Sequence, residues 1–264
     1  MKNLVFDNVP IETEECYVAF LDIQGFKEYV IHHTLSDTRS LFMGVVNELS
    51  DIRKTNSSSW LSDDKRKEMC HLSKYTYITL ISDSIVIAIE KKHSGALSFL
   101  LSSCIRVQLY LLLYHNIVIR GGISAGSLYA SEPFLFGTSI VNAYNLEHCA
   151  ENFYFRILVD NLILLKETDS FLLSNVMYDE SHTNSKPIRM LDYFSRIPWR
   201  NTQIADAVIS FVKFQLAKAR QNKNAKLIEK YEWLEMRMAY SSLEYEKTIQ
   251  EHEKERSFRR KSLL

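Results

Sequence analysis

The sequence has few of the residues that divide a chain into loosely joined parts. Glycine occurs 7 times and proline 4 times in 264 residues, and no stretch rich in glycine and serine interrupts the chain. Because flexible linkers depend on such stretches, we expect compact parts that are joined without a long linker. The chain is long enough for one large domain or two small ones with a sizeable core.

An excess of charge of one sign is also lacking. Lys and Arg together number 32, and 32 Asp and Glu balance them. Binding to nucleic acid or to an anionic membrane draws on a surplus of basic residues, so we expect neither as a partner. Only the final EKERSFRRKSLL is locally basic, and such a run is more typical of a solvated tail than of a docking patch.

Cysteine is scarce, and its four copies form no C-x-x-C motif. We interpret them as reduced thiols of a cytoplasmic protein. The first residues, MKNLVFDNVPIETEE, lack the apolar core of a signal peptide. The most apolar window, around LYLLLY, is too short to cross a bilayer. The cysteines are Cys16, Cys70, Cys104 and Cys149.

Several familiar site motifs are missing as well. The chain has no Walker loop and no G-x-S-x-G elbow. Its histidines lack the helical spacing and the partner carboxylates that a zinc site needs. We therefore expect no zinc site and interpret the histidines as ordinary surface or core residues. They include His32, His33, His71, His93, His115 and His148.

The elements that are present follow the order β-α-β-β-α-β. Continuous apolar residues predict a buried strand over 16–23, and two β-branched runs, 75–80 and 84–90, have hairpin spacing. A helix capped by Ser36 follows the first strand, with Leu41, Val45, Leu49 and Ile52 as its apolar stripe. The sequence predicts further elements as helix 95–114, strand 116–126, helix 137–152 and strand 154–160. This order predicts an α+β, ferredoxin-like fold: an antiparallel sheet with helices on one face.

The last part of the chain is helical. One apolar stripe comprises Ile204, Val208, Phe211, Val212 and Leu216, and a second comprises Leu227, Tyr231, Leu234 and Met238. Stripes with this spacing usually pack in a core or a dimer interface. We therefore expect a catalytic domain over 1–199 and a helical extension over 200–264, packed on the core or at the dimer interface.

Two aspartates combine into the candidate site. Asp22 closes the first strand, and Asp83 lies at the tip of the hairpin in LISDSIV. The first and third strands of a β-α-β-β sheet are neighbours, so the two carboxylates can face one another. Adjacent carboxylates repel unless cations neutralise them, and Mg²⁺ or Mn²⁺ suits such a pair, with phosphate as a further ligand. Each aspartate alone has a simpler reading as a cap or turn residue.

Four blocks in order then resemble the class III nucleotidyl cyclases: YVAFLDIQGF, TLISDSIVIAI, IRGGISAGSLY and FGTSIVNAYNLE. They cover roughly residues 16–160. Within that superfamily the chain most resembles the small pyrimidine cyclases of bacterial Pycsar anti-phage defence. The features behind this resemblance are the bare cyclase domain, IRGGISAG, the pattern from Gly137 to Glu147, and KYEWL at 230–234.

The resemblance implies a reaction and a set of ligands. Asp22, Asp83 and the backbone carbonyl of Ile23 would hold two divalent ions, and residues Gln24, Gly25 and Phe26 would cradle a triphosphate. The ribose 3′-hydroxyl would attack the α-phosphorus and release pyrophosphate. Active sites of the family lie at a homodimer interface, where the partner chain supplies transition-state groups.

This sequence departs from the family at those groups. When the chain is aligned on Gly137 and Leu146, Val141 stands at the usual Asn position and Asn145 at the usual Arg position. Asn142 lies one residue after the usual Asn position. Asparagine donates to phosphorane oxygens more weakly than arginine. Arg120 could supply positive charge, or could simply be a strand residue paired at the surface.

The base-reading position departs too. Purine-specific members often have Lys four residues before the second metal aspartate, where this chain has Thr79. We therefore expect a pyrimidine cyclase that makes a cyclic uridylate (or cytidylate) messenger. Two alternatives stay open: an inactive cyclase-derived nucleotide-binding or scaffold protein, and a purine cyclase with a remodelled base pocket.

Overall fold

The structure, a computed structural model, describes residues 10–54, 71–149, 153–160, 163, 176–179 and 188–261. The chain divides into two compact units, Met1–Asp192 and Tyr193–Leu264. The division into a catalytic domain over 1–199 and an extension over 200–264 stays a prediction.

The first unit is built on one sheet with strand order β2-β3-β1-β4-β6-β8-β7, and β5 pairs with β4 beside this path. The order β2-β3-β1-β4, with antiparallel neighbours throughout, is that of a ferredoxin-like βαββαβ core. The predicted α+β fold is therefore confirmed. The strands are β1 (Ile11–Ile23), β2 (Thr76–Ile81), β3 (Ser84–Glu90), β4 (Ile119–Ser131), β5 (Phe134–Phe136), β6 (Ile157–Val159), β7 (Val176–Asp179) and β8 (Ile188–Leu191).

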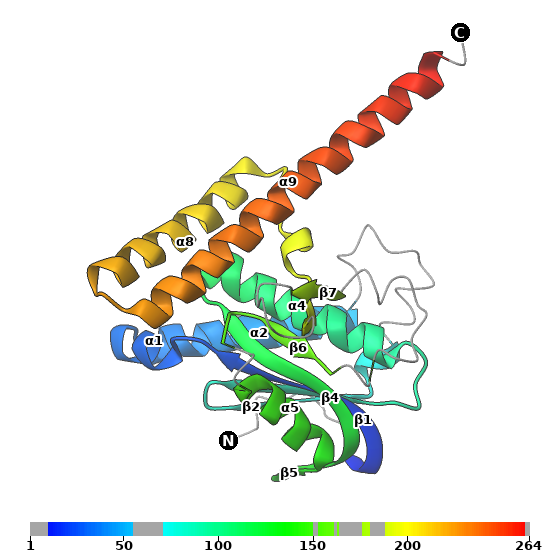
Figure 1. Ribbon diagram of the computed structural model, residues 1–264. Coiled ribbons are helices and arrows are strands. Elements are labelled where there is room, and N and C mark those ends of the chain that lie inside the picture. The colour runs from blue at the N-terminus through cyan, green and yellow to red at the C-terminus, as the bar shows by residue number, and fades with distance from the viewer. Residues whose placement is uncertain are drawn as a thin grey trace. The chain divides into compact units, whose positions relative to one another are not determined.

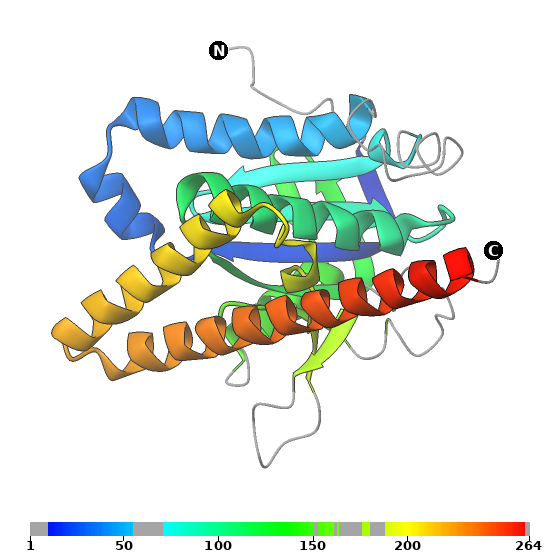
Figure 2. The same ribbon diagram turned by 90° about the horizontal axis from the view of Figure 1, so that it is seen from above.

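Helices cover the two faces of this sheet (Figure 1). On one face α2 (Leu35–Lys54) and α4 (Ala96–His115) lie side by side (Figure 2), and α4 packs on β1 and β3. On the other face α5 (Thr138–His148) packs on β4 and β1. The short helix α1 (Phe26–His32) connects β1 to α2. The two helices of the βαββαβ core, α2 and α4, therefore share one face as expected, and α5, which follows this core in the chain, adds a helix on the opposite face.

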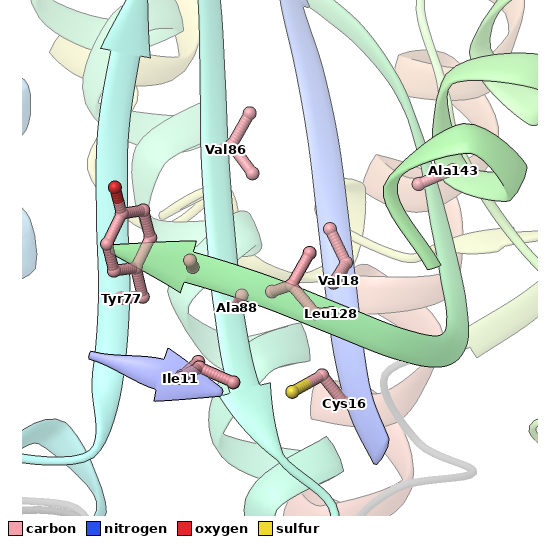
Figure 3. Packing of buried hydrophobic residues seen from close by; sticks show 9 residues of the cluster. Ile11, Cys16, Val18, Tyr77, Val86, Ala88, Leu128 and Ala143 are labelled. Carbon is pink, nitrogen blue, oxygen red and sulfur yellow. The ribbon is translucent and has the colours of Figure 1, made fainter. Parts of the chain in front are cut away.

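Alternation along β1 decides which side chains meet which helix. Ala19, Leu21 and Ile23 belong to one face and are almost completely buried. Cys16 and Val18 belong to the other face, where they share a core with Ala143 of α5. Figure 3 shows this second core, in which the far end of β4 crosses in front of β1 and β3.

Two local expectations need correction. Ser36 is not the helix cap, because Thr34 and Asp37 form a reciprocal capping box in which Asp37 N–H donates to Thr34 Oγ1 at 3.2 Å and Thr34 N–H donates to Asp37 Oδ2 at 3.0 Å. The apolar window around LYLLLY belongs to α4, which by length and composition alone could cross a membrane. However, 72% of its most apolar window is buried within the protein, as in a core helix.

The second unit is an antiparallel pair of helices, α8 (Thr202–Gln221) and α9 (Ala225–Lys261), preceded by a 3₁₀ turn, η1 (Phe194–Arg196). Asn201 accepts a hydrogen bond from the N–H of Ile204 and caps α8. The indole N–H of Trp199 donates to the carbonyl of Phe194 at 3.2 Å and to Ser241 Oγ of α9 at 3.3 Å, and so ties the turn to α9.

Most residues of the predicted apolar stripes are buried, while Ile204 and Tyr231 are half-buried. Val208, Phe211, Val212, Leu216, Leu234 and Met238 are buried. Leu227 is exposed instead, and Trp233 takes a place in the core, where its ring meets Phe194 edge-on. The first residues of the basic tail continue α9 as far as Lys261.

Candidate active site

The two aspartates meet at one edge of the sheet. Asp22 is paired in register with Ser84 of β3, and Asp83 occupies the two-residue turn between β2 and β3. The backbone N–H of Ile23 donates to the carbonyl of Asp83 at 2.9 Å. The main chain therefore fixes the two acidic residues beside each other, as the sequence predicted.

The environment of Asp22 carries surplus negative charge. The pKa of Asp22 is raised from 3.8 to about 6, first by its half-buried position and then by the carboxylates of Glu147 and Asp83, in that order of importance. The positive charges of Arg120 and His148 act in the opposite direction. The side-chain amide of Gln24 donates a short hydrogen bond to Asp22 Oδ2. A cation bound here would relieve the repulsion.

Oxygen ligands for such a cation are at hand. Asp22 and Asp83 supply carboxylates, and the carbonyl of Ile23 leaves the strand on the same side as its N–H, toward the hairpin turn. Among the described residues, no group of three or more His, Cys, Asp or Glu side chains could hold a metal by itself. Two carboxylates completed by substrate phosphates are nevertheless the usual ligand set of Mg²⁺, so these residues fit a divalent ion.

The segment expected to cradle phosphate is a turn, but it offers one amide fewer than predicted. The N–H of Gln24 donates to the carbonyl of Val118 at 3.0 Å and is not available to a phosphate. Gly25 has φ +77° and starts α1, and a Cβ added there would meet nothing within 4 Å. The ring of Phe26 packs on Phe42 of α2, so its side chain has a structural role.

Asn142 and Asn145 are exposed on α5, whereas Ala143 and Glu147 face the sheet. Val141 is also exposed, at 54%. Both asparagines therefore lie outside the buried face of α5. Their part in catalysis, which would be played in a partner's site, stays a prediction.

Thr79 lies on the same sheet face as Asp22. It pairs with Val86 of β3, which in turn pairs with Phe20, two residues before Asp22. Thr79 is half-buried on the outer strand of this row. This position is compatible with contact to a nucleotide base, while the base-reading role itself stays a prediction.

Arg120 sits opposite Asp22 in the register of β1 and β4. Its guanidinium pairs with the carboxylate of Glu147 at 2.5 Å, and Glu147 is completely buried on α5. Nδ1 of His148 contacts the other carboxylate oxygen of Glu147. Arg120 is thus a paired strand residue, which is one of its two expected roles. The Arg120–Glu147 pair nevertheless lies next to the candidate metal site, because Arg120 is opposite Asp22.

The role of Glu147 was missed by sequence reasoning. Three histidines have single carboxylate partners: His148 pairs with Glu147, His93 with Glu90 at 3.2 Å, and His32 with Glu28 at 3.5 Å. One signal for Glu147 was available. Gly122 lies on the face of Arg120, and a Cβ there would clash with Ala143 O at 2.2 Å, so only glycine lets α5 approach this closely.

No disulfide joins the cysteines that the structure describes, Cys16, Cys104 and Cys149. Cys104 is buried in α4 and its environment raises its pKa far above the ordinary value, so it is not a reactive thiolate. Cys70 lies outside the described residues.

No protein-family model and no curated protein matches the chain. Among solved structures the chain is similar to nucleotide cyclases. The adenylyl cyclase CyaB from P. aeruginosa is 15% identical, with a TM-score of 0.43, over 68% of this chain and 93% of that one. A guanylyl cyclase domain of the RhoGC fusion protein from the aquatic fungus Blastocladiella emersonii is 14% identical, with a TM-score of 0.45, over 69% and 94%.

A third similar structure is the adenylate/guanylate cyclase/hydrolase from Silicibacter pomeroyi. It is 14% identical, with a TM-score of 0.43, over 68% of this chain and 96% of that one. Likeness at these identities concerns the fold alone.

Proposed function

We propose that this protein is a nucleotidyl cyclase that converts a nucleoside triphosphate into a 3′,5′-cyclic nucleotide and pyrophosphate. The observation that carries the proposal is the meeting of Asp22 and Asp83 at one sheet edge, fixed by the β1–β3 register and by the Ile23–Asp83 hydrogen bond. Repelling acids at a half-buried edge favour a cation site over a purely structural role.

Two divalent cations, Mn²⁺ or Mg²⁺, would supply the charge that lowers the pKa of the ribose 3′-hydroxyl and neutralises the triphosphate. Asp22, Asp83 and the carbonyl of Ile23 would hold them. The 3′-oxygen forms a bond to the α-phosphorus, the bond to the bridging oxygen breaks, pyrophosphate leaves, and the hydroxyl proton passes to solvent. The work of the chain is then positioning and charge neutralisation.

The other residues have assigned parts in this proposal. Gly25 and Phe26 would bind phosphate through the backbone at the turn after β1, with Gln24 holding Asp22 by its side-chain amide. Asn145, with Asn142 beside it, would donate to the phosphorane oxygens in the site of a partner chain. Arg120 would contribute positive charge beside Asp22. The exposure of both asparagines supports an active site shared in a homodimer.

We propose a pyrimidine substrate, UTP before CTP, and a role as a cytoplasmic messenger synthase in anti-phage signalling. The support for this is the resemblance to Pycsar cyclases and Thr79, which stands where purine-specific cyclases often have Lys. Threonine offers a hydroxyl that donates or accepts one hydrogen bond. ATP or GTP as the substrate is the competing proposal, and it fits the fold equally well.

The decisive experiment incubates the purified chain with each of the four ribonucleoside triphosphates and Mn²⁺ and measures cyclic nucleotide and pyrophosphate. We expect cyclic UMP as the main product. Cyclic AMP or GMP would replace the pyrimidine proposal with the purine one. A chain that makes no cyclic product from any nucleotide would be a binding or scaffold protein.

The shared site is tested by complementation. Asp22→Ala and Asn145→Ala should each be inactive alone, because each lacks a group for every site of its homodimer. Randomly mixed chains should recover about a quarter of the wild-type sites, since half of the dimers are hybrids with one complete site. If the mixture stays inactive while both variants dimerise, Asn145 or the interface is assigned wrongly.

A further inference from the structure

The buried carboxylate of Glu147 is held by two groups at once. Arg120, a residue of β4, binds Glu147 Oε1 at 2.5 Å, and His148 at the end of α5 contacts Glu147 Oε2. A carboxylate with no exposed surface is stable only when it is paired, and breaking such a pair is costly. The Arg120–Glu147 contact is therefore a fixed part of the fold rather than a surface ion pair.

The histidine arm of this arrangement is also fixed. The ring of His148 stacks on Tyr144 at 3.9 Å between centroids, and Tyr144 meets Phe20 edge-on at 5.4 Å. Phe20 precedes Asp22 on the same face of β1. The end of α5 is thus anchored over the strand that carries Asp22, and Glu147 can act on groups at this edge of the sheet.

Arg120 has a second possible partner in Asp22. The two residues are directly opposite in the register of β1 and β4, and such residues have Cβ atoms only about 5 Å apart. A guanidinium that closed on Asp22 would form a charge-assisted pair. That pair would occupy the carboxylate oxygens that a divalent cation needs.

We propose that Glu147 is a positioning residue that holds Arg120 by its guanidinium and so keeps Asp22 available to a divalent cation. The inference rests on the proposed function, because it takes Asp22 as a cation ligand. It adds that the arginine beside the site must be restrained. Without Glu147 the same arginine becomes a competitor of the metal.

A simpler account treats Glu147 only as a distant negative charge that attracts the cation. The two accounts differ in a double-mutant cycle. A distant charge has the same effect whatever residue stands at position 120. A restraint on Arg120 has an effect only while Arg120 is present.

The experiment titrates the metal-free full chain with Mn²⁺ and measures its dissociation constant from free Mn²⁺ by electron paramagnetic resonance. The variants are Glu147→Gln, Arg120→Met and both together. We expect Glu147→Gln to weaken Mn²⁺ binding about tenfold in the presence of Arg120, the scale of one charged hydrogen bond. With Met at position 120 the same change should weaken binding less than about twofold.

A matched control removes the same charge elsewhere on the sheet. Glu90 at the far end of β3 also pairs with a lysine and a histidine, Lys92 at 2.7 Å and His93 at 3.2 Å. It is separated from Ser84 by six residues of strand, about 20 Å. Glu90→Gln should leave Mn²⁺ binding unchanged. Circular dichroism and melting curves establish that each variant is folded.

The variant Glu147→Asp serves if Glu147→Gln does not fold. It keeps the charge but draws the carboxylate back by one methylene. The positioning account therefore expects weaker Mn²⁺ binding, whereas the distant-charge account expects unchanged Mn²⁺ binding. Equal weakening in both backgrounds of the cycle, or unchanged binding in Glu147→Asp, would overturn the positioning role alone. A wild-type chain whose Mn²⁺ binding does not depend on Asp22 would overturn the proposed function as well.

Discussion

The two faces of the β1–β3–β4 sheet differ in what their side chains do. Under α4 the strands present Leu21, Ile85 and Ile87, all fully buried. Under α5 the same strands begin with an apolar core around Val18 and end in a charged edge with Asp22, whose row continues through Arg120 to Glu147. One face therefore supplies stability, and the end of the other concentrates charge at a cost to stability.

The largest expected effect comes from removing the acids of the α5 face. Asp22→Ala or Asp83→Ala should lower turnover by at least about a thousandfold, because each removes a proposed cation ligand. The metal-free melting temperature should stay the same or rise slightly, since repulsion is relieved. A large loss of metal-free stability would instead assign these acids a structural role.

Removing a side chain from the opposite face should act on stability. Leu21→Ala leaves a cavity under α4 and should lower the free energy of unfolding by about 2–5 kcal/mol, measured by urea denaturation. Ile81→Ala provides the control, because Ile81 is 51% exposed on the outer strand. It should change the free energy of unfolding by no more than about 0.5 kcal/mol. Similar costs for the two variants would contradict the contrast between the faces.

Gly122→Ala tests how tightly α5 must lie on the sheet. The new Cβ would come within 2.2 Å of the Ala143 carbonyl and 2.6 Å of Leu146 Cβ, so the helix has to shift. We expect a loss of about 1–3 kcal/mol in unfolding free energy, together with reduced turnover because α5 carries Glu147. Gly25→Ala has open space around it and should cost about 1 kcal/mol from its left-handed backbone alone.

The last prediction concerns pH. Because the folded-state pKa of Asp22 is raised to about 6 from 3.8, its contribution to stability is full below pH 3.8 and is lost as pH rises through about 6. Metal-free Asp22→Asn should therefore melt higher than wild type at pH 7.5, and the difference should vanish near pH 4. Added Mn²⁺ should raise only the wild-type melting temperature. If metal-free wild type melted higher than Asp22→Asn at pH 7.5, the carboxylate of Asp22 would stabilise the fold, contrary to this prediction.

The strands of the βαββαβ core and their order were predictable because they depend on local patterns, whereas β5, β7 and β8 were not predicted. Continuous apolar residues around Val18 and the two-residue turn at Asp83 carry enough information to place the two acids at one edge. The capping box at Thr34 was overlooked because Ser36 has the same side-chain chemistry. Only the hydrogen bond from the backbone N–H of Asp37 to Thr34 Oγ1 decides between the two residues.

The rest of the site depends on tertiary contacts that no local pattern encodes. Glu147 lies 27 positions after Arg120, and their meeting requires α5 to rest on Gly122. The side of the sheet taken by α5 was likewise not contained in the element order. The hydrogen bond from the backbone N–H of Gln24 to the carbonyl of Val118 follows from the pairing of β1 with β4. Sequence patterns indicate that pairing only in outline.

The bond from the Ile23 amide to the Asp83 carbonyl has a consequence for how freely this protein can change. It joins peptide groups, which every residue except proline can supply in the same way. Neighbouring side chains on these strands can thus be exchanged for others of like size without moving the acidic pair. A recoded sheet that keeps the strand lengths and both aspartates should preserve their spacing, which makes this edge a suitable scaffold for grafting onto a designed protein.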